Sequence, residues 1–126
     1  MQARLAFCKD ENGQTAAEFA LVLIVFLALV FGTLGLSFAV WANETLQFAT
    51  EAAARCASVT PTVCNSQSTV QSYGISHYNG PNILPITFSY SKSGSCGNQV
   101  TATATIPLDA VVVDLSVPLS ASACFP

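Results

Sequence analysis

The feature that most constrains this chain is an uninterrupted apolar run from Phe19 to Ala42. It contains no charged residue, and its only polar interruptions are Thr33 and Ser37. At ~1.5 Å per residue, a helix of this run is about 36 Å long, enough to cross the hydrocarbon core of a bilayer with some tilt. A buried core helix has a similar composition, but a chain of 126 residues has too little remaining mass to surround it. The run therefore predicts one membrane-spanning helix over about 19–42.

The composition argues against catalysis and against nucleic-acid binding. Only 9% of the residues are charged and the formal net charge is −3, so the chain offers no basic patch to a nucleic acid. One histidine, His77, and the lack of a CxxC pair argue against a zinc site. There is no glycine-rich phosphate loop and no Ser–His–Asp pattern. Asp109 and Asp114 are expected in a solvated loop rather than in a catalytic pair. We therefore expect that the chain is not an enzyme and binds no cofactor.

The helical pattern continues beyond the apolar run. In "ANETLQFATEAAARCA", one polar stripe recurs at spacings of three, four and four, and an apolar stripe occupies a different face. Glu51 and Arg55 are placed for an i,i+4 ion pair. We therefore expect one helix over 14–57, with its second half standing above the membrane as a stalk. The polar stripe comprises Glu44, Gln47, Glu51 and Arg55, and the apolar stripe comprises Leu46, Ala49, Ala53 and Cys56.

The remainder predicts a small head over 58–126. Pro61 ends the long helix, and a short helix is expected between Asn65 and Tyr78, before the turn signal "NGP". Strands are expected in "PITFSYS", in "QVTATATIPL" and over 117–125, where Pro107 and Pro118 suggest sheet edges or bends. The predicted fold class is α+β, with a long transmembrane and stalk helix followed by a small disulfide-stapled domain that contains a short helix and an antiparallel sheet.

Four of the five cysteines follow the apolar run, and Cys8 precedes it. An even set in a segment of about 85 residues suggests two disulfides in an oxidising compartment. One pairing joins Cys56 to Cys64 and Cys96 to Cys124, and on the loop-entropy argument these contribute about 2.6 and 3.6 kcal/mol. The other two connectivities remain open from sequence. The segment that carries Cys8 is then expected on the cytoplasmic side.

Three interpretations compete for "ENGQTAAEFALVLIVF", which places Glu18 at the start of the apolar run. A secretory signal peptide has a cleavage signal at "VWA", but the apolar run is longer than such peptides need. A plain membrane anchor keeps the carboxylate in its first helical turns, where the macrodipole favours it. The third interpretation uses Gly13. A short polar leader, then Gly13, then Glu18 five positions on and a continuous apolar helix resemble type IV prepilins, which a prepilin peptidase cuts after the glycine.

The resemblance narrows to one family. "GQTAAEFALVLIVFLALVFG", "TLQFATEAAARCASV" and the terminal "SVPLSASACFP" resemble the TadE-like pseudopilins of tight-adherence, or type IVc, pili. Phe19 stands where the major pilins of that system usually have Tyr, and Gln14 is an uncommon first mature residue. The resemblance implies a leader over 1–13, cleavage between Gly13 and Gln14, and use as a minor pilin. It also implies three classes of partner, namely the prepilin peptidase, other pilins and pseudopilins, and the inner-membrane assembly platform.

The motif assigns Glu18 a physical role. Cleavage creates an α-amine on Gln14, and this cation neutralises a carboxylate that is otherwise costly near hydrocarbon. The resemblance implies that Glu18 pairs with this amine of a neighbouring subunit. A second expected contact is a smooth helix face for close packing. Its members recur at spacings of four, three and four, and they are Ala28, Gly32, Gly35 and Ala39.

The expected location is the inner membrane, with one span in the lipid bilayer and the C-terminal domain outside the cytoplasm. The alternative is an uncleaved single-span anchor whose head binds a periplasmic partner. A smaller alternative is an adhesive head, in which Tyr73, Tyr78 and Tyr90 line a binding surface.

Overall fold

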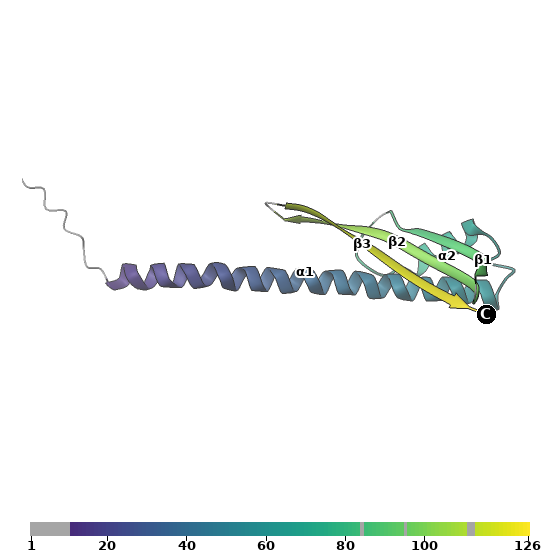
Figure 1. Ribbon diagram of the computed structural model, residues 1–126, viewed down its shortest axis with the longest axis horizontal. Helices are drawn as coiled ribbons and strands as arrows, with labels where there is room; N and C mark the ends of the chain where they lie inside the picture. Colours follow the sequence, from purple (N-terminus) through teal and green to yellow (C-terminus); the bar gives the residue numbers. More distant parts are fainter. Residues whose placement is uncertain (1–10, 84, 95, 111–112) are drawn as a thin grey trace, which may run out of the picture. The chain divides into compact units, whose positions relative to one another are not determined.

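The predicted fold class is confirmed. The computed structural model describes residues 11–83, 85–94, 96–110 and 113–126. Two helices, α1 (Glu11–Val59) and α2 (Gln67–His77), precede three strands, β1 (Thr87–Gly94), β2 (Gly97–Ala110) and β3 (Val113–Phe125) (Figure 1). The strands form one antiparallel sheet in the order β1-β2-β3. The chain divides into two compact units at Leu36 and Ser37.

The first unit contains the apolar half of α1. Its side chains from Gly13 to Leu29 are all exposed. An 18-residue window of this helix has a mean hydropathy of 2.8 and no buried residue, so the helix is long and apolar enough to cross a membrane. The expected leader falls largely on residues 1–10, which lie outside the described part of the chain.

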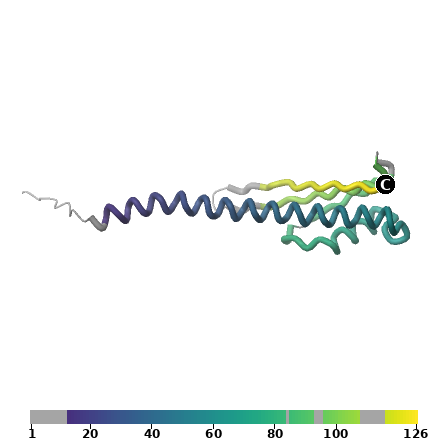
Figure 2. Tube along the Cα trace, turned by 90° about the horizontal axis from the view of Figure 1, so that it is seen from below, coloured from purple at the N-terminus to yellow at the C-terminus, as the bar shows by residue number. Residues whose placement is uncertain are grey.

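The second unit is the head, and the C-terminal half of α1 belongs to its core. Figure 2 shows this half running along the sheet, with α2 beside it. The predicted apolar face of α1 is confirmed, because Leu46, Ala49 and Ala53 have no exposed surface and Cys56 has 6%. The expected stalk is therefore packed within the head. Full burial starts with Ala42, and Ala39 is already partly buried against the core.

The predicted polar stripe lies on the uncovered side of α1, with different partners than expected. Glu44, Glu51 and Arg55 are exposed. Among the described residues, no ion pair joins Glu51 to Arg55. Gln47 Nε2 instead donates to Glu51 Oε1 at 3.2 Å, and the Arg55 guanidinium carbon lies 5.8 Å from the centroid of the Phe125 ring. A guanidinium above an aromatic face is a favourable contact that needs the C-terminal strand in place.

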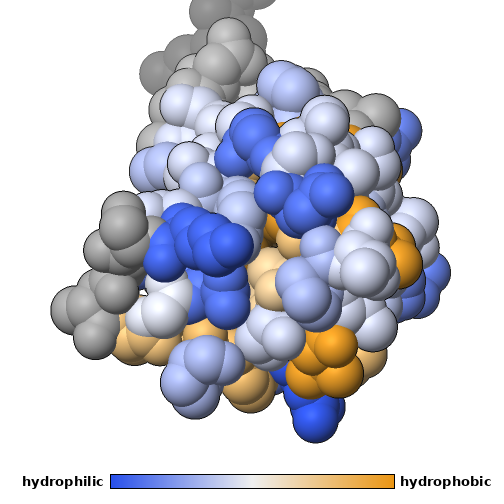
Figure 3. Space-filling model, turned by 90° about the vertical axis from the view of Figure 1, so that its right-hand side faces the viewer, coloured by the Kyte–Doolittle hydropathy of each residue, from blue (hydrophilic) through white to orange (hydrophobic). Residues whose placement is uncertain are grey.

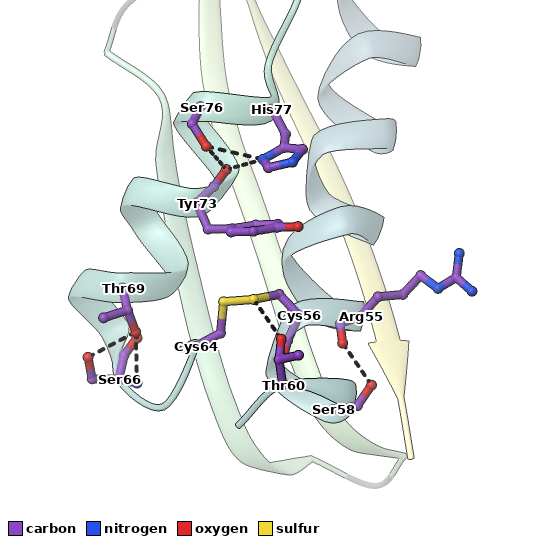
Figure 4. The surroundings of a disulfide bond; sticks show 10 residues. All are labelled: Arg55, Cys56, Ser58, Thr60, Cys64, Ser66, Thr69, Tyr73, Ser76 and His77. Carbon is purple, nitrogen blue, oxygen red and sulfur yellow. Dashed lines mark hydrogen bonds between the residues drawn. A yellow bond between two sulfur atoms is a disulfide. The ribbon is translucent and has the colours of Figure 1, made fainter. Parts of the chain in front are cut away.

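Both expected disulfides are present. Cys56 and Cys64 join the end of α1 to the segment before α2, with a Cα–Cα distance of 5.7 Å, and the Tyr73 ring lies close to this bridge (Figure 4). Cys96 and Cys124 join the β1–β2 turn to the end of β3, with a Cα–Cα distance of 6.1 Å. Gly97 follows Cys96 with a φ of 103°, a left-handed conformation that favours glycine and closes the predicted turn "GSCGN".

The hairpin of β2 and β3 is longer than expected, which corrects the position of two aspartates. The register continues through Asp109↔Asp114 to Ala110↔Val113, so both residues belong to strands. The expectation of a loop was wrong because backbone pairing of two long strands outweighs the weak strand propensity of single aspartates. The expected last strand at Val117 begins four residues earlier.

The segment between α2 and β1 is fixed by Tyr78. Its hydroxyl donates to Pro81 O at 2.9 Å, and a Cβ at Gly80 would overlap both this hydroxyl and the Thr45 side chain. Burial raises the pKa of Tyr78 above its ordinary value, and a hydrogen bond with Thr45 opposes that shift. The turn signal "NGP" thus holds the chain against α1.

We expect Gly74→Ala to destabilise the head. A Cβ at this α2 position would lie 2.8 Å from Cε1 and Cζ of Phe88, whose side chain has no exposed surface. Overpacking costs about 1–3 kcal/mol, and the better helix propensity of alanine returns less than about 1 kcal/mol. Thermal unfolding of the full chain in detergent should therefore show a free energy of unfolding lower by about 1–2 kcal/mol.

Ser72→Ala is the matched control, because Ser72 lies on the exposed side of the same helix. It should not lower the unfolding temperature. A Gly74→Ala chain as stable as this control would show that α2 and β1 have room to separate.

Candidate processing and assembly segment

The three residues of the predicted processing motif lie at the start of α1. Gly13, Gln14 and Glu18 are all exposed, and among the described residues no atom beyond the neighbouring helix backbone lies within 4 Å of a Cβ built on Gly13. Gln14 Nε2 donates to Glu18 Oε1 at 3.4 Å, a contact one helical turn apart. The two residues thus share a face of α1, so an α-amine created on Gln14 would arise one turn from the carboxylate.

The bond between Gly13 and Gln14 lies within α1, whose described part begins at Glu11. Glycine weakens a helix by about 1 kcal/mol relative to alanine, so Gly13 lowers the cost of local unwinding at this bond.

The described part of the first unit, residues 11–36, offers Glu18 no cationic side chain. Residues 11–36 contain no Lys, Arg or His, and Glu18 is the only charged residue between Gly13 and Asn43. A carboxylate in the first turns of a helix interacts favourably with the macrodipole by about 0.3–1 kcal/mol. This is smaller than the several kcal/mol needed to remove a charge from water. An apolar environment around Glu18 therefore requires a cation from elsewhere.

The predicted packing face is open only in its first part. No atom lies within 4 Å of a Cβ built on Gly32 or Gly35, and Ala28 is exposed. Ala39 is partly buried and packs against the hydrophobic core of the head. The face available to another helix thus consists of Ala28, Gly32 and Gly35.

An aromatic pair that was not predicted from the sequence lies at the start of the head. Phe38 is 38% exposed and Trp41 is 50% exposed, and their rings meet edge to face with centroids 6.1 Å apart. Tryptophan is enriched at membrane–water interfaces, and the first charged residue, Glu44, follows less than one turn later. The sequence does contain a signal for this pair, because its only tryptophan stands at the end of the apolar run.

Each of the three tyrosines considered for a binding surface has its own local contacts. Tyr90 Oη donates to Asn98 Oδ1 at 2.8 Å, Tyr73 stacks on the His77 ring at 4.1 Å, and Tyr78 contacts Pro81. All three are partly buried against the core. The His77 Nδ1 atom lies 3.0 Å from Tyr73 O and 3.1 Å from Ser76 Oγ (Figure 4). Each of these groups has a local packing role.

The head offers little else that resembles a chemical site. Across the part of the chain that the structure describes, no three His, Cys, Asp or Glu residues gather to hold a metal ion. Figure 3 shows the end of the head as a mixed surface, on which hydrophobic groups form separate small patches. The exposed apolar surface is concentrated in the N-terminal half of α1, from Phe19 to Leu36.

Comparison with known proteins agrees with this distribution. The family described as TadE-like protein matches residues 13–55, which begin at the predicted processing glycine and end in the part of α1 that belongs to the head. No curated protein and no solved structure matches the chain. Residues 13–55 are thus similar to the TadE-like family, the same family that the sequence resembles.

Proposed function

We propose that this chain is a minor pilin of a tight-adherence pilus, released from its leader by a prepilin peptidase that cuts after Gly13. The observation that carries the proposal is the TadE-like match over residues 13–55, which covers the processing motif and the exposed apolar helix together. The chain is held in the inner membrane by α1, with its disulfide-bonded head outside the cytoplasm. From there it joins other pilins through the assembly platform.

The head supports a minor role. In the family that the sequence resembles, the major subunit is little more than the helix, whereas this chain adds a three-stranded sheet and two disulfides. Disulfides persist in oxidising compartments, which favours a head outside the cytoplasm. The proposal assigns the chain no catalytic activity, because a pilin is a structural subunit and a substrate of the peptidase.

Glu18 supplies the electrostatic part of the proposal. The apolar side chains around it need an apolar environment, first the bilayer and then the packed helices of the filament. In the filament, Glu18 neutralises the α-amine of Gln14 in a neighbouring subunit. The open face of Ala28, Gly32 and Gly35 then allows the helices to approach closely.

The alternative function is an uncleaved anchor that presents the head to a periplasmic partner. It needs no processing and leaves Gly13 without a role. The two functions differ in the N-terminus of the protein. Protein recovered from its native membrane should begin at Gln14 by intact-mass analysis, and a Gly13→Leu chain should retain residues 1–13. A wild-type chain that still begins at Met1 in cells with an active peptidase favours the anchor.

We expect Glu18→Gln to be cleaved and to remain absent from pili. The substitution keeps the shape of the side chain and removes its charge, so a buried amine is left without a counter-ion. That state costs roughly 3–5 kcal/mol, which lowers subunit association by more than about a hundredfold. The measurement is the amount of the chain in sheared pili relative to membranes.

Glu44→Gln is the control, since Glu44 is exposed on the head. It should enter pili at the wild-type level. Normal incorporation of the cleaved Glu18→Gln chain would refute the pairing role and leave cleavage itself unaffected.

The membrane position of the head can be tested through Trp41, the only tryptophan of the chain. In phosphatidylcholine vesicles, its fluorescence should be quenched most by lipids brominated close to the glycerol backbone, and less by lipids brominated near the bilayer centre. The control chain carries Trp41→Phe and Phe48→Trp, which moves the reporter about 10 Å along the helix and past Glu44. This reporter should be quenched weakly at every depth. Equal weak quenching of both chains would show that the head stands away from the bilayer.

A further inference from the structure

The outer edge of β1 is occupied by two glutamine side chains of α2. Gln71 Oε1 accepts from the backbone N of Phe88 at 2.6 Å, and Gln71 Nε2 donates to Ile86 O at 2.9 Å. Gln67 Oε1 accepts from the backbone N of Tyr90 at 2.7 Å, and Gln67 Nε2 donates to Phe88 O. Two carboxamides thus satisfy four successive outward-facing backbone groups, from Ile86 just before β1 to Tyr90 within it.

The match between helix and strand is geometrical. A carboxamide presents the donor and acceptor of a peptide group, so each glutamine takes the place of one peptide unit of a neighbouring strand. Residues i and i+4 are about 6 Å apart along a helix, and alternate strand residues are about 6.6 Å apart. Gln67 and Gln71 therefore follow β1 in the antiparallel direction. Their carboxamides occupy the positions that two peptide groups of a fourth strand would take.

The exposed edges of the other strands contain different obstacles to pairing. On β3, Ser122 O accepts from Gln47 Nε2 at 3.4 Å, so it faces away from β2. Backbone groups alternate along a strand, so Pro118, four residues earlier, faces the same edge and offers no N–H. On β2, Thr101 pairs with Ser89 on the β1 side, and Pro107 faces that side beyond the last pair, Thr87↔Thr103. Proline at such an edge prevents a continuous ladder.

The obstacles on β1 lie only at the ends of its edge, at Pro85 and Lys92. Between them, residues 86–91, "ITFSYS", contain no charge and no proline. Edge strands of this kind pair readily with other strands. In the antiparallel direction the edge is self-complementary, because each copy offers donors and acceptors in the same alternating order. Its natural partner is therefore the same edge of a second copy.

We propose that the β1 edge is a latent self-association surface for a second copy of this chain, and that Gln67 and Gln71 keep it closed. The two side chains hold the backbone groups that two heads would otherwise share. Heads that are crowded together in a membrane or a filament then remain separate, and subunit contacts are left to α1. This inference goes beyond the proposed function and does not require cleavage after Gly13.

The test compares the full chain in detergent micelles with a Gln67→Ala/Gln71→Ala variant. Alanine keeps the helix and adds no apolar surface, so new association cannot be attributed to hydrophobic side chains. Amide hydrogen exchange read by NMR should show protected Phe88 and Tyr90 amides in the wild type. In the variant at low concentration both amides should exchange about tenfold faster, as expected for the loss of one hydrogen bond each.

Sedimentation should then show that the variant associates as its concentration rises, while the wild type does not. The matched control is Ser68→Ala/Ser72→Ala on the exposed side of α2, which should behave as the wild type. Adding Ser89→Lys to the glutamine variant places a charge on the exposed edge strand, and this should restore the wild-type sedimentation. Each of these results supports the proposal.

Three results would overturn it. The first is rapid exchange of the Phe88 and Tyr90 amides in the wild type. The second is a glutamine variant that exchanges rapidly and stays unassociated at every concentration. The third is association that Ser89→Lys leaves unchanged. If the double variant does not fold, the single variant Gln67→Ala takes its place in the test. It should expose the Tyr90 amide and leave the Phe88 amide bound to Gln71.

Discussion

The rest of the structure depends on one helix, α1, whose two halves each need an apolar environment. In the head, small residues such as Ala42, Ala49 and Ala53 are fully buried, so this part of α1 has its apolar environment within the protein. From Phe19 to Leu36, large apolar side chains remain exposed. Burying each of them is worth about 1.5–3 kcal/mol, so together they correspond to roughly 20 kcal/mol of unsatisfied hydrophobic surface. The subunit therefore needs a second apolar environment, which a bilayer or a bundle of like helices provides.

A carboxylate within such a segment is costly to bury, whereas on a soluble helix it would stay in water. In the proposed assembly, Glu18 is the one charged side chain of residues 14–42 that enters the apolar environment with the helix, and residues 11–36 provide no cationic side chain. A charge of this kind discriminates strongly between arrangements, because a correct neighbour neutralises it and an incorrect one leaves it buried and unpaired. Hydrophobic packing alone has little directional preference. In the filament that we propose, the charge thus provides the axial specificity that a smooth face of Ala28, Gly32 and Gly35 cannot supply.

The head shows how a small domain is kept both folded and separate. Its core is limited, and two disulfides restrict the unfolded chain where the sheet and the helices end. A three-stranded sheet has a high proportion of edge, and an exposed edge is a general route to unwanted pairing. The two glutamines of α2 cover the edge of β1, and Pro107 on β2 and Pro118 on β3 prevent pairing at the other exposed edges. Stability and solubility of the head thus depend on a few polar contacts as much as on its core.

The sequence by itself determined the elements of this protein. The charge-free run, the helical spacing that follows it, Pro61 and the alternating strand "QVTATATIPL" rest on local periodicity, and the processing motif rests on local spacing. Tertiary structure decided what depends on register between distant segments. It extended the hairpin through Asp109↔Asp114, placed Arg55 above Phe125 and brought Gln67 and Gln71 onto β1. The physical reason is that a periodicity shows which face of an element is apolar, whereas the partner of that face depends on how the whole chain packs.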